Sequence, residues 1–135
     1  MGSAIGAAAG LQKAGIDEPA IAIFGDSAFY HGGLNALVHA RATKLNLLTI
    51  VLDNGGAVTT GGQSTPNNTP PSSDDSETTI GIVDLASSCG VKFIWIIEDG
   101  DDTEKMSNVF REALTVETGL NMVVVRKFCK PIDEW

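Results

Sequence analysis

The sequence has few basic residues and no long apolar run, and each shortage excludes a class of function. Nine Lys and Arg stand against 17 Asp and Glu, which gives a formal net charge of −8 at pH 7. So acidic a chain has no electrostatic attraction for nucleic acid or for anionic lipid surfaces. The Ala- and Gly-rich start lacks a basic leader and is interrupted at Lys13, too early for a membrane span. We therefore expect a chain that binds neither nucleic acid nor membrane.

Cysteine and histidine are also scarce. Cys89 and Cys129 are far apart and fit neither a disulfide framework nor the four thiolates of an iron–sulfur cluster. Cys89 ends an amphipathic segment, so we expect it to be a packed core thiol. The only histidines are His31 and His39, whereas a hydrolase with Ser27 as nucleophile needs a histidine late in the chain. We expect a cytoplasmic protein that carries no cluster of its own and is not a Ser27 hydrolase.

The length and the order of apolar segments predict a single α/β domain over residues 1–135. Helix-like and strand-like segments alternate, with one long polar loop near the middle. This alternation is typical of a three-layer α/β/α sandwich with a mainly parallel sheet. The expected strands are 20–24, 46–52, 92–97 and 121–125. The expected helices are one that ends at Gly15, then 32–45, 82–89, and one between a cap at Asp101 or Asp102 and Gly119.

Three stretches carry further structural expectations. The strand at 20–24 is uninterrupted and apolar, which is typical of a central strand buried on both faces. The polar interval 55–79 is too long for a bare connection, so we expect an ordered Gly/Thr half at a site and a flexible loop at about 64–79. Glycine recurs every fourth residue in the first helix, which gives a smooth face for tight packing or for a cofactor: Gly2, Gly6 and Gly10.

The strongest chemical signal follows the first two strands. Asp26 comes directly after the first strand and Asn54 directly after the second. Both fall at the carboxyl edge of the expected sheet, where α/β proteins bind their ligands. A carboxylate, an amide oxygen and a backbone carbonyl near Gly56 suit Mg²⁺, which takes oxygen ligands and shares them with substrate phosphates. The alternative is that Asp26 and Asn54 are ordinary turn residues after strands.

These residues also carry a resemblance to thiamine-diphosphate enzymes. Gly25-Asp26-Ser27, followed later by Asn54, resembles the metal and diphosphate motif of that class. The chain is most similar to the diphosphate-side domain of indolepyruvate ferredoxin oxidoreductase α subunits, within the 2-oxoacid ferredoxin oxidoreductases. This similarity rests on residues 1–6, 25–33 and 60–66, and in weaker form it covers nearly the whole chain. It implies the thiamine-diphosphate-binding fold.

The resemblance implies a role for each matching residue. Asp26, Asn54 and the Gly56 carbonyl would hold Mg²⁺. His31 would face the substrate as a proton donor or carboxylate anchor, the alternative being a helix-start histidine bonded to the backbone. Met1 would be the bulky residue beneath the bent cofactor. The other implied cofactor-binding residues are Gly2, Gly25, Ser27, Ala28, Thr60, Gly61 and Gly62.

The implied reaction needs parts that this sequence does not contain. In the family that it resembles, a 2-oxo acid is decarboxylated, electrons pass through an iron–sulfur cluster to ferredoxin, and coenzyme A takes the acyl group. The catalytic glutamate on a pyrimidine-binding domain and the four-cysteine cluster segment would belong to a partner domain or subunit. We therefore expect a homo-oligomeric assembly and an inactive isolated chain.

Two alternatives to the oxidoreductase remain. Thr60-Gly61-Gly62-Gln63 also resembles phosphonopyruvate decarboxylase-like enzymes, so the chain can be half of a non-oxidative phosphonopyruvate or sulfopyruvate decarboxylase. It can also be a split or degenerate module that binds without catalysis.

Overall fold

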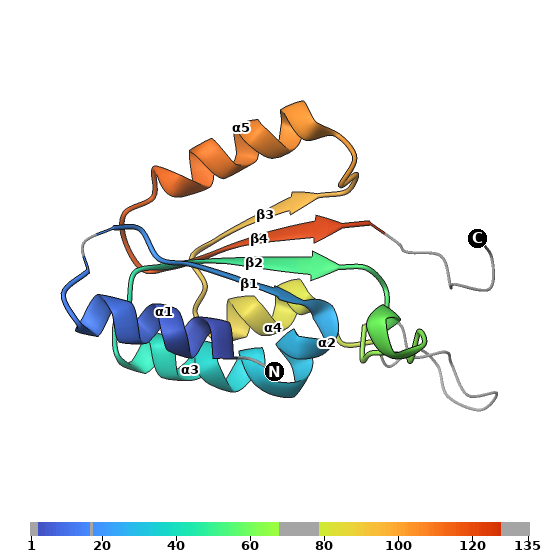
Figure 1. The fold of residues 1–135 in the computed structure, drawn as a ribbon, viewed down its shortest axis with the longest axis horizontal. Coiled ribbons are helices and arrows are strands. Elements are labelled where there is room, and N and C mark those ends of the chain that lie inside the picture. Colours follow the sequence, from blue (N-terminus) through green and yellow to red (C-terminus); the bar gives the residue numbers. More distant parts are fainter. Residues whose placement is uncertain (1–2, 17, 68–78, 128–135) are drawn as a thin grey trace.

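The computed structural model describes residues 3–16, 18–67 and 79–127. Its four strands form one parallel sheet in the order β1-β2-β4-β3 (Figure 1). The strands are β1 Ile21–Gly25, β2 Leu47–Asp53, β3 Phe93–Ile97 and β4 Leu120–Arg126. The helical segments are α1 Ser3–Lys13, α2 Asp26–Ala28, the π-turn η1 Phe29–Gly33, α3 Leu34–Ala42, the 3₁₀ turn η2 Val58–Thr60, α4 Ile82–Ser88 and α5 Thr103–Leu114.

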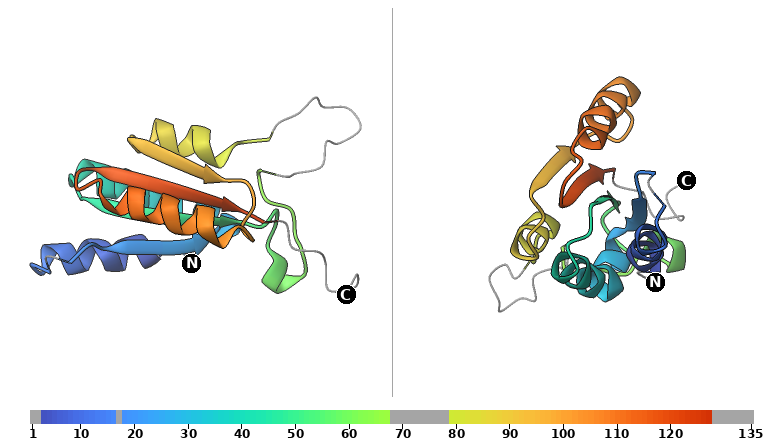
Figure 2. Two further views of the ribbon diagram at one scale, coloured as in Figure 1. Left: turned by 90° about the horizontal axis from the view of Figure 1, so that it is seen from above. Right: turned by 90° about the vertical axis from the view of Figure 1, so that its left-hand side faces the viewer.

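Helices cover both faces of the sheet, as the sequence predicted. Helices α1, α3 and α4 lie on one face and α5 lies on the other (Figures 1 and 2). The larger core, beneath α1, α3 and α4, contains the fully buried Phe29, Leu37 and Met122. The smaller core, between the sheet and α5, contains Ile97 and Val123. The fold is therefore the predicted three-layer α/β/α sandwich.

Strand β1 departs from the prediction of a central strand buried on both faces. It lies at the edge of the sheet and pairs with β2. One face packs into the larger core through Ala22 and Phe24. On the other face Ile21 is 42% and Ile23 is 56% exposed, because α5 packs over the other strands and does not cover β1 (Figure 1). Within the described chain, the expectation of a doubly buried central strand was wrong.

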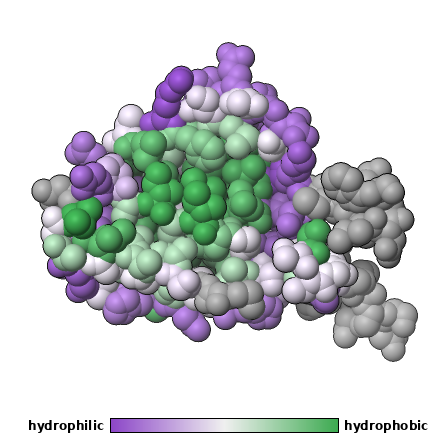
Figure 3. Space-filling view, in the orientation of Figure 1, coloured by the Kyte–Doolittle hydropathy of each residue, from purple (hydrophilic) through white to green (hydrophobic). Residues whose placement is uncertain are grey.

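The uncovered face of β1 continues onto β2. Leu52, on the same face of the sheet as Ile21 and Ile23, is 45% exposed. We call these three residues the β1 strip. Figure 3 shows hydrophobic surface across the middle of this side of the molecule. At the amino ends of the strands the surface is hollowed into a cavity of about 480 Å³, lined in part by Leu48 and Leu114.

The helix after β1 begins earlier than predicted. Residues 26–42 are helical throughout, as α2, η1 and α3, whereas the sequence predicted a helix over 32–45. Gly33 does not start a helix but permits close packing, since a Cβ there would lie 3.2 Å from Cε2 of Phe24. Asp26 therefore stands in the first turn of a long helix, and the exposed His31 lies within that helix rather than at its start.

Two local expectations, the cap at Asp102 and the packed Cys89 thiol, are confirmed. Asp102 caps α5 by accepting a hydrogen bond from the Lys105 amide at 2.9 Å. Cys89 packs against the larger core, and burial raises the pKa of its thiol. None of the helices in the described ranges has both the length and the apolar character that crossing a membrane requires.

The glycine face of α1 meets nothing in the described chain. Ile5 and Ala8 lie on the buried side of the helix, whereas a Cβ on Gly6 or Gly10 would have no neighbour within 4 Å. Gly2 lies outside the described residues. Tight packing against this face and approach of a cofactor to it therefore both stay predictions.

Candidate functional site

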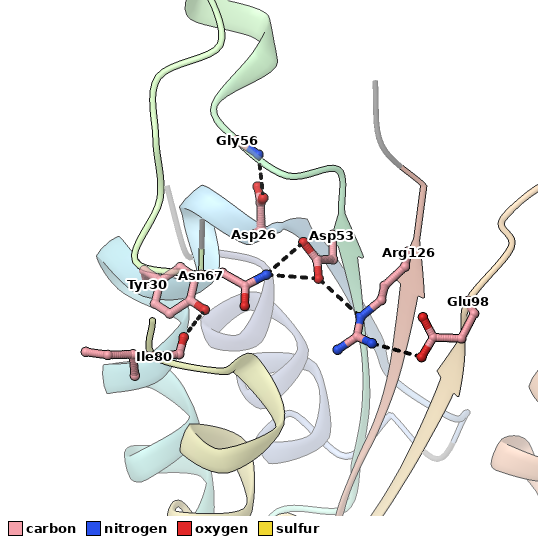
Figure 4. A network of polar contacts seen from close by, with 8 residues as sticks. All are labelled: Asp26, Tyr30, Asp53, Gly56, Asn67, Ile80, Glu98 and Arg126. Carbon is pink, nitrogen blue, oxygen red and sulfur yellow. Dashed lines mark hydrogen bonds and ion pairs between the residues drawn. The ribbon is translucent and has the colours of Figure 1, made fainter. Parts of the chain in front are cut away.

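Parallel pairing brings the ends of β1 and β2 together. The two strands are in register, with Gly25 opposite Leu52, so that Asp26 and Asn54 follow at the same edge of the sheet. The long helix turns away at Asp26, and a glycine-containing loop begins after Asn54. The juxtaposition of these two side chains, expected from sequence, is thus present in the fold. Figure 4 shows Asp26 and Gly56 at this edge.

Asp26 is a buried carboxylate, only 2% exposed. Its Oδ1 accepts a hydrogen bond from the Ser27 amide at 2.6 Å, and its Oδ2 accepts one from the Gly56 amide at 2.9 Å. Burial nevertheless raises the pKa of Asp26, and the charge of Asp53 adds to the rise, while the amide bonds oppose it. A cation bound to this carboxylate would reverse the shift, since it stabilises the charged form.

Asn54 completes a cluster of oxygens. One end of its side-chain amide lies 3.2 Å from Oδ1 of Asp26 and 2.7 Å from the Gly56 carbonyl oxygen. With nitrogen at that end, the amide donates to both oxygens. Turned by half a rotation, it places its oxygen there instead, so that a carboxylate, an amide and a carbonyl oxygen converge. This donor set fits Mg²⁺, a hard cation that binds through a few protein oxygens and keeps places for water and phosphate.

The Gly/Thr loop lies beside this cluster but satisfies its own polar groups. The Gly61 amide donates to Val58 O and the Gly62 amide to Ala57 O, each at 3.1 Å. The Thr60 hydroxyl contacts Ala57 O at 3.1 Å and the Gln63 side chain at 2.6 Å. Thr60, Gly61 and Gly62 are all exposed. The loop is therefore held by its own hydrogen bonds and is exposed to solvent, and the Gly61 and Gly62 amides are engaged internally.

The remaining predicted residues fall at the same edge or outside the described chain. Gly25 precedes the long helix, and Ser27 and Ala28 form its first turn, half-buried beside Asp26. Met1 and Gly2 lie outside the described residues, as does most of the loop expected to be flexible at about 64–79.

A second polar group at this edge had no role in the sequence analysis. It is centred on Asp53, only 3% exposed, which contacts the side chains of Asn67 and Arg126 (Figure 4). Tyr30 lies nearby, and its hydroxyl donates to Ile80 O at 2.6 Å. The sequence contained only a weak indication of this contact, because Asp53 ends β2 and the oppositely charged Arg126 ends β4.

One family of domains matches nearly the whole chain. Residues 1–125 match the family described as "Thiamine pyrophosphate enzyme, C-terminal TPP binding domain". The chain belongs to this family of thiamine-diphosphate-binding domains.

Related sequences are subunits of an oxidoreductase. The chain is 30% identical to "Indolepyruvate oxidoreductase subunit IorA" of Archaeoglobus fulgidus over 129 residues, which cover 96% of this chain and 20% of that subunit. It is 34% identical to the subunit of the same name from Pyrococcus abyssi, again over 96% of this chain and 22% of that subunit. The chain thus spans 20% to 22% of the length of these relatives.

Solved structures share the fold at lower identity. A 2-oxoglutarate:ferredoxin oxidoreductase from Magnetococcus marinus superposes with a TM-score of 0.82 at 20% identity, over 98% of this chain and 48% of that one. A thiamine diphosphate-dependent 4-hydroxybenzoylformate decarboxylase from Rhodococcus jostii RHA1 gives a TM-score of 0.68 at 24% identity, over 96% of this chain and 24% of that one. Both likenesses show the fold.

Proposed function

We propose that this chain is the Mg²⁺ and diphosphate anchor of a thiamine-diphosphate-dependent 2-oxoacid ferredoxin oxidoreductase of the indolepyruvate type. The observation that carries the proposal is the convergence of the Asp26 carboxylate, the Asn54 side-chain amide and the Gly56 carbonyl at the carboxyl edge of the sheet. Membership of the family supports the cofactor, and similarity to IorA subunits supports the reaction class. When bound, thiamine diphosphate supplies the chemistry of 2-oxoacid decarboxylation.

The three converging groups would bind the metal, and the start of the long helix would bind the diphosphate. An anion beside Gly25, Ser27 and Ala28 meets the positive end of a helix that runs through residues 26–42. Thr60, Gly61 and Gly62 would contact the same group after exchanging their internal hydrogen bonds for bonds to phosphate oxygens; their exposure supports this role.

Three further residues would act on the organic parts of the ligands. Met1 and Gly2 are proposed to lie beneath the cofactor. His31 is proposed to face the 2-oxo acid, because it is exposed on the same helix that Asp26 begins.

We infer that the other half of the active site comes from a partner domain or subunit. The relatives are much longer than this chain, which covers 20% of the Archaeoglobus subunit. The acid–base glutamate on a pyrimidine-binding domain and the iron–sulfur cluster would lie in that remainder, within a cytoplasmic homo-oligomer. Ferredoxin would take the electrons and coenzyme A the acyl group. The isolated chain is expected to bind cofactor weakly and to turn over no substrate.

Titration calorimetry with thiamine diphosphate, with and without Mg²⁺, tests the anchor. We expect weak binding that requires Mg²⁺ and is lost in Asp26→Ala. Glu117→Ala is the control, because it removes an exposed acidic group of equal charge near the amino ends of the strands, away from the proposed site. Binding that is unchanged in Asp26→Ala, or absent from the wild-type chain at millimolar cofactor and also with a partner domain, would refute the proposal.

A second measurement separates oxidoreductase from decarboxylase. With the partner supplied, the oxidoreductase reduces ferredoxin in a reaction that requires coenzyme A. Release of an aldehyde without ferredoxin reduction would instead identify a non-oxidative decarboxylase.

A further inference from the structure

Asp53 is a buried charge beside the metal site that is not one of the converging ligands. It directly precedes Asn54 and is 3% exposed. Nδ2 of Asn67 lies 3.3 Å from its Oδ1 and 3.2 Å from its Oδ2. Nε of Arg126 lies 3.5 Å from the same Oδ2. A carboxylate this deeply buried costs stability unless it is paired and hydrogen-bonded, and both partners are present here.

Arg126 ties Asp53 to the rest of the sheet. The two residues are opposite each other in the β2–β4 register, and the Lys127 amide also donates to the Asp53 carbonyl at 3.0 Å. On its other side, Nη1 of Arg126 contacts Oε1 of Glu98, next to β3, at 2.8 Å (Figure 4). A row of alternating charges therefore links the ends of β2, β4 and β3.

Asn67 ties Asp53 to the far end of the Gly/Thr loop. The loop leaves the sheet at Asn54, and Asn67, 14 residues after Asp53, returns to contact Asp53, so that the segment between them is closed at its base. The neighbouring Pro66 carbonyl accepts a bond from the Ile80 amide at 2.9 Å. The Ile80 carbonyl in turn accepts from the Tyr30 hydroxyl at 2.6 Å. The base of the loop is thus joined both to β2 and to the long helix.

We propose that Asp53 is a positioning residue for Mg²⁺: held by Asn67 and Arg126, it closes the Gly/Thr loop on the end of β2 and so fixes the Asn54 and Gly56 oxygens. This inference rests on the proposed function. In it, Asp53 does not itself bind the metal. Mg²⁺ demands near-ideal octahedral geometry, whereas Ca²⁺ accepts irregular shells. Loss of the contacts that Asp53 makes with Asn67 and Arg126 should therefore weaken Mg²⁺ binding more than Ca²⁺ binding.

NMR titration of the full chain with each cation, in the presence of millimolar thiamine diphosphate, measures this difference even for weak binding. Asn67→Ala removes both hydrogen bonds to Asp53 from a half-buried loop position and leaves the core intact. We expect the Mg²⁺ dissociation constant to rise about tenfold, since bonds to a charged group are lost. The Ca²⁺ constant should change less than about twofold, because its shell adapts. Asn108→Ala, an exposed asparagine on α5, should change neither.

A rescue pair separates positioning from general destabilisation. Asn67→Asp sets a second carboxylate against Asp53 and should weaken Mg²⁺ binding more than Asn67→Ala does. Adding Asp53→Asn restores a carboxylate–amide pair and should recover part of the loss, as in a double-mutant cycle.

The outcomes are distinct. Equal losses for both cations, unchanged Mg²⁺ affinity in Asn67→Ala, or no rescue would overturn the positioning role. If the wild-type chain shows no Mg²⁺-dependent shift at Gly56, either alone or with a partner domain, the proposed function itself fails and this inference fails with it.

Discussion

The carboxylate of Asp26 and the amide of Asn54 stand 3.2 Å apart at the ends of two paired strands. They meet because β1 and β2 run parallel and in register, so that both chains leave the sheet at the same edge. One strand–helix–strand unit is therefore sufficient to assemble the proposed metal ligands.

Binding of Mg²⁺ should stabilise the folded chain, and this stabilisation should depend on Asn54. Mg²⁺ with thiamine diphosphate is expected to raise the Tm of the wild-type chain, and excess chelator to lower it again. A ligand at 100 times its Kd stabilises the folded state by about 2.7 kcal/mol. In Asn54→Ala one of the three proposed oxygen ligands is missing, so scanning calorimetry should detect no metal-dependent change in Tm. A shift as large as that of the wild-type chain would contradict the ligand assignment.

Tyr30 should ionise only when the chain unfolds. Burial and the charges of Asp53 and Asp26 raise the pKa of Tyr30 above the ordinary 10.0. Above pH 10.0 the unfolded chain loses this proton while the folded chain keeps it. The folded state then binds more protons, so stability falls as the pH rises through this window.

The sequence contains a single tyrosine, so ultraviolet absorbance of the phenolate follows Tyr30 alone. We expect the phenolate band to appear together with loss of near-ultraviolet circular dichroism. An ordinary titration curve in the folded chain would rule out the buried position.

Two helical glycines should respond oppositely to alanine. Gly33→Ala places a Cβ 3.2 Å from the Phe24 ring and 3.4 Å from Ala28 O, and such overpacking is expected to cost about 1–2 kcal/mol. Gly10→Ala adds a methyl group to open space on α1 and should stabilise by about 0.5–1 kcal/mol through helix propensity. Urea unfolding measures both, and equal effects at the two sites would contradict the packing described.

The β1 strip should promote self-association of the isolated chain. Ile23→Lys places a charge on the strip at a residue that is 56% exposed, so its effect on folding stability should stay within about 0.5 kcal/mol. Sedimentation velocity should show less concentration-dependent association than in the wild-type chain. Val38→Lys, at a residue 54% exposed on α3, is the matched control and should leave association unchanged. Equal effects of the two variants would exclude the strip as the cause.

The sequence predicted the proximity of Asp26 and Asn54 better than it predicted their surroundings. Asp26 and Asn54 follow consecutive parallel strands, a relationship that the order of apolar segments already contains. The contact between Asp53 and Arg126 depends on β4 lying next to β2, which the order of segments does not specify. Likewise, the apolar residues of β1 are those of a buried strand, and only the position of α5 shows that Ile21 and Ile23 are uncovered.

The Gly/Thr loop was predicted at the site, but not its internal bonding. Glycine content indicates that a backbone can approach a ligand closely, and it says nothing about the current partners of the amides. The structure shows that Gly61 and Gly62 already donate within the loop.

The position of β4 between β2 and β3 also sets an order of assembly. As the chain leaves the ribosome, β1, the long helix and β2 can pair at once, since their contacts are local. Within the described sheet, β3 pairs with β4 and therefore waits for the last strand. Arg126 is the final residue of that strand. The corner that carries Asp26 and Asn54 can thus form before β3 and β4 have been made, and the ion pair to Asp53 closes only when β4 has emerged.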